Sequence, residues 1–435
     1  MPRKKPEESE KIEEKEEIAI KKNSKEEKVQ PEINIGMVGH VDHGKTTLTM
    51  AMTGKWTDTH SEEIKKGITI RLGYADASFY KCNKCEGTDA YTTQPVCKKC
   101  GGKAEFLRNV SFVDAPGHES LMATMLSGAT IMDGALLLVA ANEECPQPQT
   151  REHLMALEII GIDKVVVVQN KVDAVSREGA LQNYNQIKKF LENTKFKDAP
   201  IIPISAQHKV NIGALIEAIQ KIITTPARDS TKDPIMFVAR SFDINKPGDL
   251  PEKLIGGVLG GSLKQGMLKV NDEIEIRPGY EVTEANKKIW KPLKTKIAGL
   301  MTGSEKVDAV KPGGSIGVLT LLDPAIIKAD SLGGAIVGLP GKLPNVWYNL
   351  NLETHLLERV VGSKDELNVE PIKLGESLML NVNSAATVGI VTKIGKNKAE
   401  CRLKLPVCAE KGSRVTISRL IKTRFRLIGY GIIKE

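Results

Sequence analysis

The chain has 435 residues, of which 41% are hydrophobic, and a net charge of +8; this length suffices for two to four domains with cores of their own. Its longest apolar runs, such as Ala135–Ala141, are too short to span a bilayer, and the Lys- and Glu-rich start lacks the apolar segment of a secretory signal. We therefore expect a cytoplasmic protein without a membrane partner, in which the seven cysteines are reduced thiols or metal ligands.

The basic excess lies at one end of the chain. Residues 375–435 hold 12 Lys and Arg against four Glu, a net charge of +8, so the residues before them sum to zero. Such asymmetry is typical of proteins that bind a polyanion, because each neutralised phosphate releases counterions. A solvated basic surface explains it equally well at this point.

The first 30 residues carry nine basic and nine acidic side chains and almost no apolar ones, which predicts a disordered charged tail. From Ile33 onwards, apolar runs alternate with helical stretches, as in a parallel sheet covered by helices on both faces. The predicted strands are Ile33–Val38, Asn109–Val113, Gly134–Val139, Lys164–Gln169 and Ile201–Ile204. The predicted helices lie near Thr47–Met52, Glu119–Ser127, Thr150–Ile160, Glu178–Asn193 and Ile212–Ile223. These elements make up a predicted α/β domain over residues 31–225, followed by a linker at Thr224–Pro234.

Beyond the linker, helix signals nearly vanish, and short strand-like runs recur between Gly and Pro turns. This spacing predicts a closed antiparallel β-barrel over residues 235–345. A second barrel is predicted over residues 346–435, with strands near Leu378–Val382, Gly389–Lys393, Lys398–Leu403 and Ser413–Ser418. The expected fold is a mostly parallel α/β domain followed by two antiparallel β-barrels.

A phosphate-binding loop is predicted between the first strand and the first helix. Gly39–Thr46 reads GHVDHGKT and matches the pattern GxxxxGK[ST]. The glycines let main-chain N–H groups surround phosphates at a helix N-terminus. Lys45 would place its charge on the β- and γ-phosphates, and Thr46 its hydroxyl on Mg²⁺. The other nucleotide-contact candidates here are Asp42, His43, Gly44 and Thr47.

Two segments nearby suit the γ-phosphate and its metal. Asp114 follows the second predicted strand and can hold Mg²⁺ through water, while the Gly117 N–H can approach the γ-phosphate. Thr69, in the sequence KGITI at Lys66–Ile70, lies between these loops along the chain. It is placed to reach Mg²⁺ and γ-phosphate when GTP is bound and to release them after hydrolysis.

Two further strand ends suit a guanine base. In Asn170-Lys171-Val172-Asp173, the carboxylate of Asp173 can accept hydrogen bonds from the N1–H and amino groups of guanine, which adenine lacks in that arrangement. In Ser205-Ala206-Gln207, the Ala206 N–H can donate to guanine O6. Because ligands of α/β sheets bind at the carboxyl ends of strands, four such loops in order predict a P-loop GTPase domain that binds GTP or GDP with Mg²⁺.

Four cysteines form a predicted structural Zn²⁺ site within a knuckle at residues 80–103. Two Cys-x2-Cys pairs are separated by 11 residues, and Gly and Pro residues supply tight turns around them. Four thiolates at this spacing suit tetrahedral Zn²⁺, whereas a disulfide pair does not suit the cytosol. The predicted ligands are Cys82, Cys85, Cys97 and Cys100.

The motifs carry a resemblance to a known family. GHVDHGKTTL at Gly39–Leu48, DAPGHE at Asp114–Glu119 and NKVD at Asn170–Asp173 resemble translational GTPases of the elongation factor Tu type. The cysteine knuckle, RSFDINKPG at Arg240–Gly248 and GLPGKLP at Gly338–Pro344 are similar to the gamma subunits of archaeal and eukaryotic initiation factor 2. The similarity extends from about Pro31 to the C-terminus, and the intact cysteine set is more archaeal than eukaryotic.

The resemblance implies a protein-synthesising GTPase whose hydrolysis is slow in the isolated chain. In the GTP state it would bind methionylated initiator tRNA and deliver it to the small ribosomal subunit. Alpha and beta subunits would complete a heterotrimer, with alpha on the middle barrel and beta on the GTPase domain. No DNA partner is implied.

The resemblance also assigns roles to single residues. His118, after Gly117, is placed as the hydrolytic histidine that positions the attacking water, and Val41 and Ile68 form a hydrophobic gate. Magnesium contacts map to Thr46 and Thr69, with Asp42 and Gly67 as further contributors.

The basic end of the chain offers a tRNA surface. Arg414, Arg419, Lys422, Arg424 and Arg426 cluster there, and in Ser418–Leu427 the cations partly alternate with apolar residues. This alternation predicts one strand with a cationic face that would bind the acceptor arm or elbow of the initiator tRNA.

Three rival hypotheses remain open in the sequence. A selenocysteinyl-tRNA elongation factor shares the barrels and switches, although the zinc knuckle and the lack of a further C-terminal domain disfavour it. A non-hydrolysing nucleotide-binding scaffold is disfavoured by the intact Thr69, Gly117 and His118. A zinc-dependent RNA-binding module leaves the nucleotide motifs unexplained.

Overall fold

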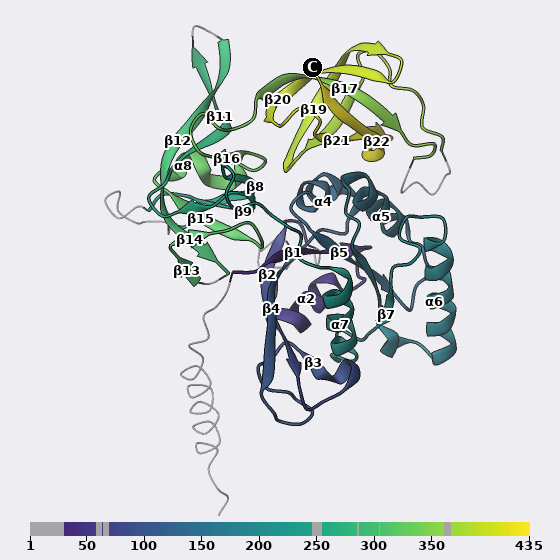
Figure 1. The fold of residues 1–435 in the computed structure, drawn as a ribbon. Coiled ribbons are helices and arrows are strands. Elements are labelled where there is room, and N and C mark those ends of the chain that lie inside the picture. The colour runs from purple at the N-terminus through teal and green to yellow at the C-terminus, as the bar shows by residue number, and fades with distance from the viewer. Residues whose placement is uncertain are drawn as a thin grey trace, which may run out of the picture.

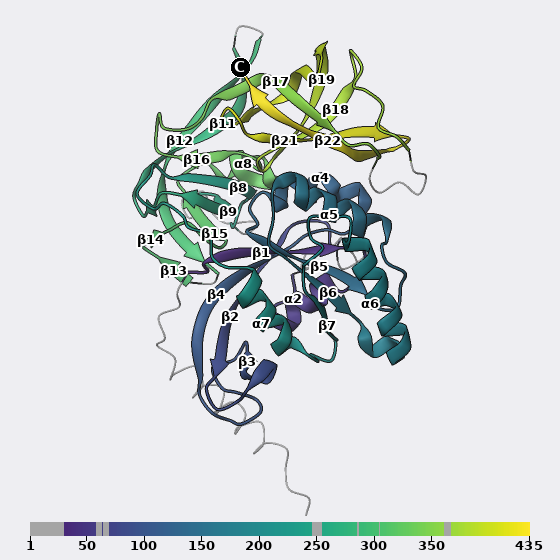
Figure 2. The same ribbon diagram turned by 45° about the vertical axis from the view of Figure 1, so that its right-hand side comes forward.

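The computed structural model describes residues 30–57, 63, 69–245, 255–284, 287–303, 305–360 and 367–435. They form an α/β domain and two β-barrels, and both barrels lie on the same side of the α/β domain (Figures 1 and 2). The predicted charged tail up to residue 29 lies outside the described residues, as do Gly67 and Ile68. No helix in the described part of the chain combines the length and the apolar character needed to cross a membrane.

A seven-stranded sheet forms the centre of the α/β domain, in the order β3-β2-β4-β1-β5-β6-β7. The strands from β4 to β7 in this order run parallel, whereas β2 and β3 are antiparallel to their neighbours. Their bounds are β1 Ile33–Gly39, β2 Gly73–Cys82, β3 Tyr91–Thr92, β4 Ala104–Asp114, β5 Gly134–Ala140, β6 Val165–Asn170 and β7 Ile201–Pro203.

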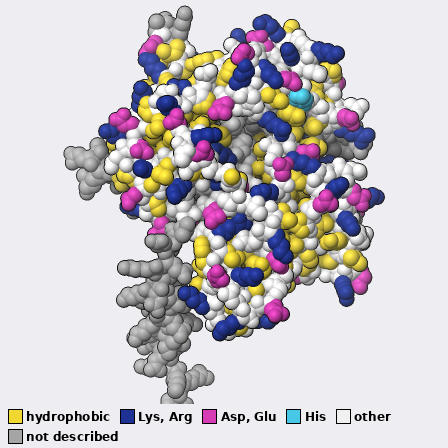
Figure 3. Space-filling view, viewed as in Figure 1, with side chains coloured by type: hydrophobic (Ala, Val, Ile, Leu, Met, Phe, Trp, Pro, Cys, Tyr) yellow, Lys and Arg dark blue, Asp and Glu magenta, His cyan; other side chains and the backbone are white. Residues whose placement is uncertain are grey.

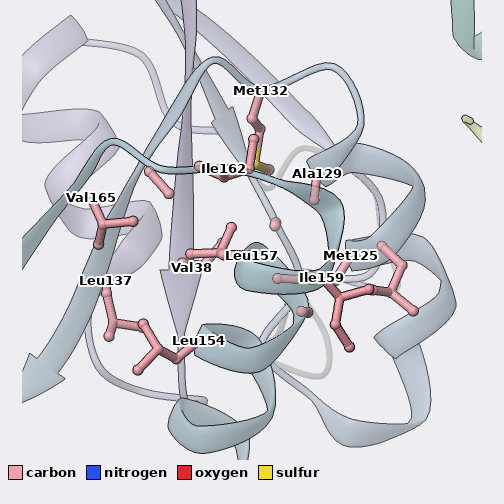
Figure 4. Packing of buried hydrophobic residues seen from close by; sticks show 14 of the residues in the cluster. Val38, Met125, Ala129, Met132, Leu137, Leu154, Leu157, Ile159, Ile162 and Val165 are labelled. Atoms are coloured by element: carbon pink, nitrogen blue, oxygen red, sulfur yellow. The ribbon is translucent and has the colours of Figure 1, made fainter. Parts of the chain in front are cut away.

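Helices cover both faces of this sheet because the central strands are apolar on both faces. In β5, Leu136 and Leu138 pack with helices α2 and α7, whereas Leu137 and Val139 pack with α4, α5 and α6 on the opposite face. Figure 4 shows this second face, with Leu137 of β5 beside Leu154 of α5. The helices are α2 Lys45–Thr53, α4 Met122–Ala129, α5 Pro148–Ile160, α6 Arg177–Leu191 and α7 Ile212–Ile222.

The hairpin-like extension of the sheet, β2 with β3, is absent from the sequence-based prediction. Strand β2 pairs antiparallel with β4 from Gly73 opposite Asp114 to Cys82 opposite Ala104. Its inward positions include the small residues Ala75 and Ala77. Strand prediction relies on large apolar side chains at alternate positions, so this segment carries a weak signal.

The first barrel closes because β11 pairs with both β16 and β12. Its ring consists of β8 Ile235–Phe242, β9 Val258–Gln265, β11 Glu273–Glu284, β12 Lys287–Thr302, β15 Ile316–Thr320 and β16 Ile336–Gly338. Short strands β10 Leu268–Lys269, β13 Glu305–Val307 and β14 Ala309–Val310 pair at its margin, and a single helical turn, α8, covers Pro324–Ile327. The ends of β11 and β12 project from the barrel as a two-stranded hairpin (Figure 1).

The second barrel is a closed antiparallel ring in the order β17-β20-β19-β18-β21-β22. Its strands are β17 Val346–Leu356, β18 Ser377–Val382, β19 Ala385–Gly395, β20 Lys398–Cys408, β21 Arg414–Ile421 and β22 Arg424–Lys434. The predicted fold class, an α/β domain followed by two antiparallel barrels, is confirmed.

The prediction of one cationic strand at Ser418–Leu427 is wrong. Strand β21 ends at Ile421 and β22 begins at Arg424, so the segment is a hairpin in which Arg419 lies opposite Arg426. Lys422 in the turn has a φ of 58°. The alternation in the sequence comes from two short arms: Arg419 lies opposite Arg426, and Arg424 lies two positions from Arg426, so these cations share one face of a hairpin and not of a single strand.

The arginines of this hairpin region bind groups of the protein itself. Arg419 pairs with Glu376 and donates to two neighbouring carbonyls, Arg426 pairs with Glu152 of α5 at 3.1 Å, and Arg414 donates to Ile159 O at 2.8 Å. On the face drawn in Figure 3, Lys and Arg are interspersed with Asp and Glu over all three units. Arg414, Arg419 and Arg426 therefore serve contacts within the protein, and the net charge of the segment overstates the number of its cations that are free of such contacts.

Directional polar contacts join both barrels to the α/β domain. Asn34 of β1 donates from Nδ2 to Ser262 Oγ at 3.1 Å and to Gly314 O at 3.0 Å in the first barrel. The second barrel contacts α4 and α5, where Arg426 meets the buried Glu152. Such contacts fix orientation, since hydrogen bonds require both distance and angle.

Glu152 should make stability depend on pH. Burial raises its pKa to about 7 from the ordinary 4.5, although Arg426 lowers it. Because the folded pKa lies above the unfolded one, this contribution to stability is fully present below about pH 4.5 and is lost as the pH rises through 7. The loss should reach ~3 kcal/mol, at 1.36 kcal/mol per unit of pKa.

The variant Glu152→Gln removes this titration and keeps an oxygen that can accept from Arg426. Urea unfolding should give similar stabilities for the two proteins near pH 5 and a more stable variant at pH 8. Parallel stability curves from pH 5 to pH 8 would show that Glu152 does not titrate in this range.

Candidate nucleotide and metal sites

The loop between β1 and α2 is shaped by glycines at its two ends. Gly39 has a φ of 140°, and Gly44, the residue before α2, has a φ of 87°. A Cβ at Gly44 would lie 2.3 Å from Asn170 Nδ2, so the loop and the end of β6 approach closely. The loop therefore leads into the N-terminus of α2, where free main-chain N–H groups favour phosphate.

Lys45 crosses this loop from the first turn of α2. Its Nζ donates to His40 O at 2.7 Å and to Gly39 O at 3.1 Å. A Cβ at Gly117 would lie 2.4 Å from the same Nζ and 2.9 Å from Gly39 O, so a side chain here would collide with the main chain of the phosphate loop. The phosphate loop and the predicted γ-phosphate loop thus meet at Lys45.

Three predicted Mg²⁺ ligands converge beside Lys45. Thr46 Oγ1 donates to Asp114 Oδ2 at 2.9 Å and lies 3.2 Å from Thr69 Oγ1. Two hydroxyls and a carboxylate are hard oxygen donors of the kind that Mg²⁺ prefers. Asp42 is exposed at the tip of the loop and has no described contact with this group, and Gly67 lies outside the described residues.

Thr57 belongs to the same cluster and was missed by sequence reasoning. Its Oγ1 donates to Asp114 Oδ2 at 2.6 Å, and its side chain is buried. Thr57 stands in no phosphate-binding motif, so nothing in the sequence pattern marks it. Thr47 lies in the first turn of α2, next to this cluster.

Asn170 connects the base-binding loops to the phosphate loop. Its Nδ2 donates to His43 O at 2.9 Å, and its Oδ1 accepts the Ala206 N–H at 3.0 Å. The Ala206 N–H, predicted to reach guanine O6, is therefore engaged by Asn170. The remaining predicted contacts lie around the rim: Lys171 with a φ of 62°, the buried Ser205 and the exposed Gln207.

Asp173 presents an ionised carboxylate at this rim. A hydrogen bond from Ser205 lowers the pKa of Asp173, and His208 Nε2 lies 3.6 Å from its Oδ2. The side chain keeps 37% of its surface exposed. An exposed carboxylate held by Ser205 can accept hydrogen bonds from a bound base.

Two histidine rings at the phosphate loop are buried and bonded within the protein. His43 is buried, with Nδ1 2.9 Å from Leu138 O and Nε2 3.3 Å from Glu143, so only its main chain borders the loop. His153 of α5, not singled out by sequence reasoning, accepts the Gly39 N–H at Nδ1, at 2.9 Å. Burial lowers the pKa of His153 to about 3, which keeps this acceptor neutral.

His118 follows Gly117 and begins a short 3-10 helix, η2, at Glu119–Leu121. Its Nδ1 accepts the Ser120 N–H at 3.3 Å and lies 2.8 Å from Ser120 Oγ. In the tautomer whose Nδ1 accepts this N–H, the ring proton lies on Nε2. Val41, the described half of the expected hydrophobic gate, is half-buried in the phosphate loop.

The four predicted metal ligands of the knuckle come together. Their sulfur atoms all lie within 4.8 Å of one another, with Cys82 and Cys100 at 3.4 Å and Cys85 and Cys97 at 3.7 Å. Four sulfurs around one Zn²⁺ at ~2.3 Å would lie about 3.8 Å apart. Main-chain N–H groups of Cys100 and Lys99 lower the pKa of Cys97 to about 7, towards the thiolate that metals bind.

Comparisons with known proteins agree with this geometry. The family of the elongation factor Tu GTP-binding domain matches residues 30–225, and the family of the C-terminal part of initiation factor eIF2 gamma matches residues 348–433. Among solved structures, a bacterial selenocysteine-specific elongation factor shares the fold with a TM-score of 0.70 and 24% identity, covering 93% of this chain and 58% of that one. Elongation factor SelB from Methanococcus maripaludis, solved with the GTP analogue GppNHp, has a TM-score of 0.66 and 24% identity, covering 93% of this chain and 79% of that one.

Curated relatives are much more similar in sequence. Translation initiation factor 2 subunit gamma from Methanothermobacter thermautotrophicus is 61% identical over 94% of this chain and 100% of its own length. The subunit from Pyrococcus furiosus is 59% identical over 93% of this chain and 98% of its own length. These values favour the initiation factor over the selenocysteine factor, and the GTP-binding domain is that of a GTP-hydrolysing translational GTPase. The chain belongs to the family of translation initiation factor 2 gamma subunits.

Proposed function

We propose that the chain binds methionylated initiator tRNA in the GTP state and delivers it to the small ribosomal subunit in the cytoplasm. It would do so as the core of a heterotrimer, with an alpha subunit on the barrel at residues 235–345 and a beta subunit on the domain at residues 31–225. The observation that carries the proposal is the convergence of Thr46, Thr69 and Asp114 beside Lys45. A hydroxyl on a separate loop within reach of the metal ligands can report which nucleotide is bound.

Different residues of the chain would bind the phosphates of GTP, hold Mg²⁺ and orient the attacking water. Lys45 would neutralise the β- and γ-phosphates, and Thr46, Thr69 and Asp114 would hold Mg²⁺, which when bound offsets charge developing on the phosphates. The Gly117 N–H would face the γ-phosphate. His118, which follows Gly117, would orient the attacking water.

The knuckle would hold Zn²⁺ in a structural role. Its own hydrophobic cluster comprises only four buried residues, Tyr80, Cys82, Cys97 and Ala104, with Cys85 packed against them. So small a core gives little stability by itself, and a metal bound by all four thiolates would supply the rest.

Binding of tRNA should follow the nucleotide and the identity of the tRNA. We expect charged initiator tRNA to bind the full chain at least about tenfold more tightly with a GTP analogue than with GDP, since Thr69 would reach Mg²⁺ and the γ-phosphate only in the GTP form. Elongator and selenocysteinyl tRNAs should bind weakly in both states. Equal affinities with GTP analogue and GDP, measured by filter binding, would contradict a nucleotide-controlled tRNA carrier.

Guanine preference should rest on Asp173. Asp173→Asn should weaken GTP binding by about 30- to 1000-fold, because losing a paired polar contact costs ~2–4 kcal/mol. Xanthosine triphosphate should then compete, since the new amide can donate to the carbonyl at C2. The measurement is fluorescent-nucleotide titration, with Asp163→Asn, an exposed aspartate outside the site, as the matched control. Unchanged GTP affinity in Asp173→Asn would remove this residue from the base pocket.

Purified protein should contain one equivalent of zinc per chain in either nucleotide state. The double variant Cys82→Ser/Cys97→Ser should lose it, because two of the four thiolates are gone. Cys145→Ser, which changes a cysteine outside the cluster, should keep the metal. Elemental analysis decides the matter, and full zinc in the double variant would show that the cluster is not the site.

A further inference from the structure

Helix α4 directly follows the loop that carries the proposed hydrolytic residue. After β4 the chain passes through His118 and η2, and α4 begins at Met122. One side of α4, with Met125 and Leu126, is buried against the sheet. The helix also contacts β18 and β19 of the C-terminal barrel, and it lies directly beneath that barrel (Figures 1 and 2).

His118 is tied to the start of this helical segment. Its Nδ1 accepts the main-chain N–H of Ser120, which lies within η2. η2 continues into α4 without an intervening loop. A shift of α4 would therefore move the group that holds the His118 ring.

A buried side chain of the barrel forms two hydrogen bonds to α4. Asn381 of β18 is 3% exposed, and its Nδ2 donates to Ala123 O at 3.0 Å and to Ser127 Oγ at 3.2 Å. These two acceptors lie one turn apart on α4. Two hydrogen bonds from one planar amide fix the helix against both rotation and sliding, which non-directional apolar contacts do not.

This polar contact is not the most stable way to fill the interface. Asn381 Oδ1 is buried without a hydrogen-bond partner among the described residues. The same holds for the hydroxyl of Thr416, which lies opposite Asn381 in β21. Burying such atoms costs free energy, so apolar side chains of the same shape would pack more favourably. The contact therefore serves orientation more than stability.

We propose that Asn381 is a positioning residue for GTP hydrolysis. Its amide holds α4, and with it η2 and His118, in the arrangement from which His118 orients the attacking water. This inference rests on the proposed role of His118. The C-terminal barrel would then influence the rate of GTP hydrolysis through its contact with α4, the helix that follows the loop of His118.

The test compares single-turnover GTP hydrolysis by the full chain in matched variants. Asn381→Asp keeps the shape of the side chain but replaces its two donors with an oxygen facing Ala123 O. Its hydrolysis rate should fall about tenfold, which corresponds to 1.36 kcal/mol, with affinities for GTP and GDP within about twofold of the original. Asn381→Leu, which adds no charge, should lower the hydrolysis rate by a similar factor. Ser127→Ala, which removes one of the two acceptors, should lower the rate less. Hydrogen exchange of α4 amides should accelerate in the Asn381 variants.

The matched control is Asn351→Asp, at an exposed asparagine of the same barrel that donates to Glu435 O; its hydrolysis and α4 exchange should be unchanged. His118→Ala separates the two proposals. If His118→Ala is slow and both Asn381 variants hydrolyse GTP at the original rate, the inference is overturned while the role of His118 stands. If His118→Ala hydrolyses GTP at the original rate, the role of His118 is wrong and the inference falls with it. If the Asn381 variants lose nucleotide affinity or melting temperature along with rate, Asn381 is only structural, and the inference is also overturned.

Discussion

One buried amide holds the loops of the nucleotide site in register. Asn170 donates to His43 O in the phosphate loop and accepts the Ala206 N–H from the loop after β7. Three loops that follow β1, β6 and β7 are thereby joined at one side chain. The position of Lys45 across its loop and of Thr46 beside Asp114 depends on this arrangement, because both follow the phosphate loop directly. Gly44 is part of the same constraint, since a Cβ there would overlap the Asn170 amide.

Buried amides also fix the positions of the two barrels relative to the α/β domain. Asn34 fixes the first barrel to β1, which leads into the phosphate loop, and Asn381 fixes the second barrel to α4, which follows the loop of His118. Each barrel thus contacts an element that ends or begins at a nucleotide-binding loop. Both contacts use buried amides, whose directional bonds set the orientation of one domain against another.

The basic C-terminal segment shows how far net charge can be interpreted. Residues 375–435 carry the whole positive excess of the chain. Yet Arg414, Arg419 and Arg426 are committed to a carbonyl of α5, to Glu376 and to the buried Glu152. Charge in a sequence is a sum, whereas binding depends on which cations remain open to solvent. Only the folded structure shows which cations are paired within the protein and which are exposed to solvent.

The sequence by itself determined the phosphate loop, the cysteine knuckle and the order of an α/β domain and two barrels. These features depend on local spacing: glycines at loop ends, Cys-x2-Cys pairs, and apolar runs with a period that matches the element. The tertiary structure alone decided the antiparallel β2, the place of Thr57 at Asp114, the bond from Gly39 to His153 and the hairpin at Ser418–Leu427. Each of these joins residues through a contact or a turn that the fold sets. Patterns along the sequence do not predict these contacts, because the partner residues come together only when their strands and helices have packed.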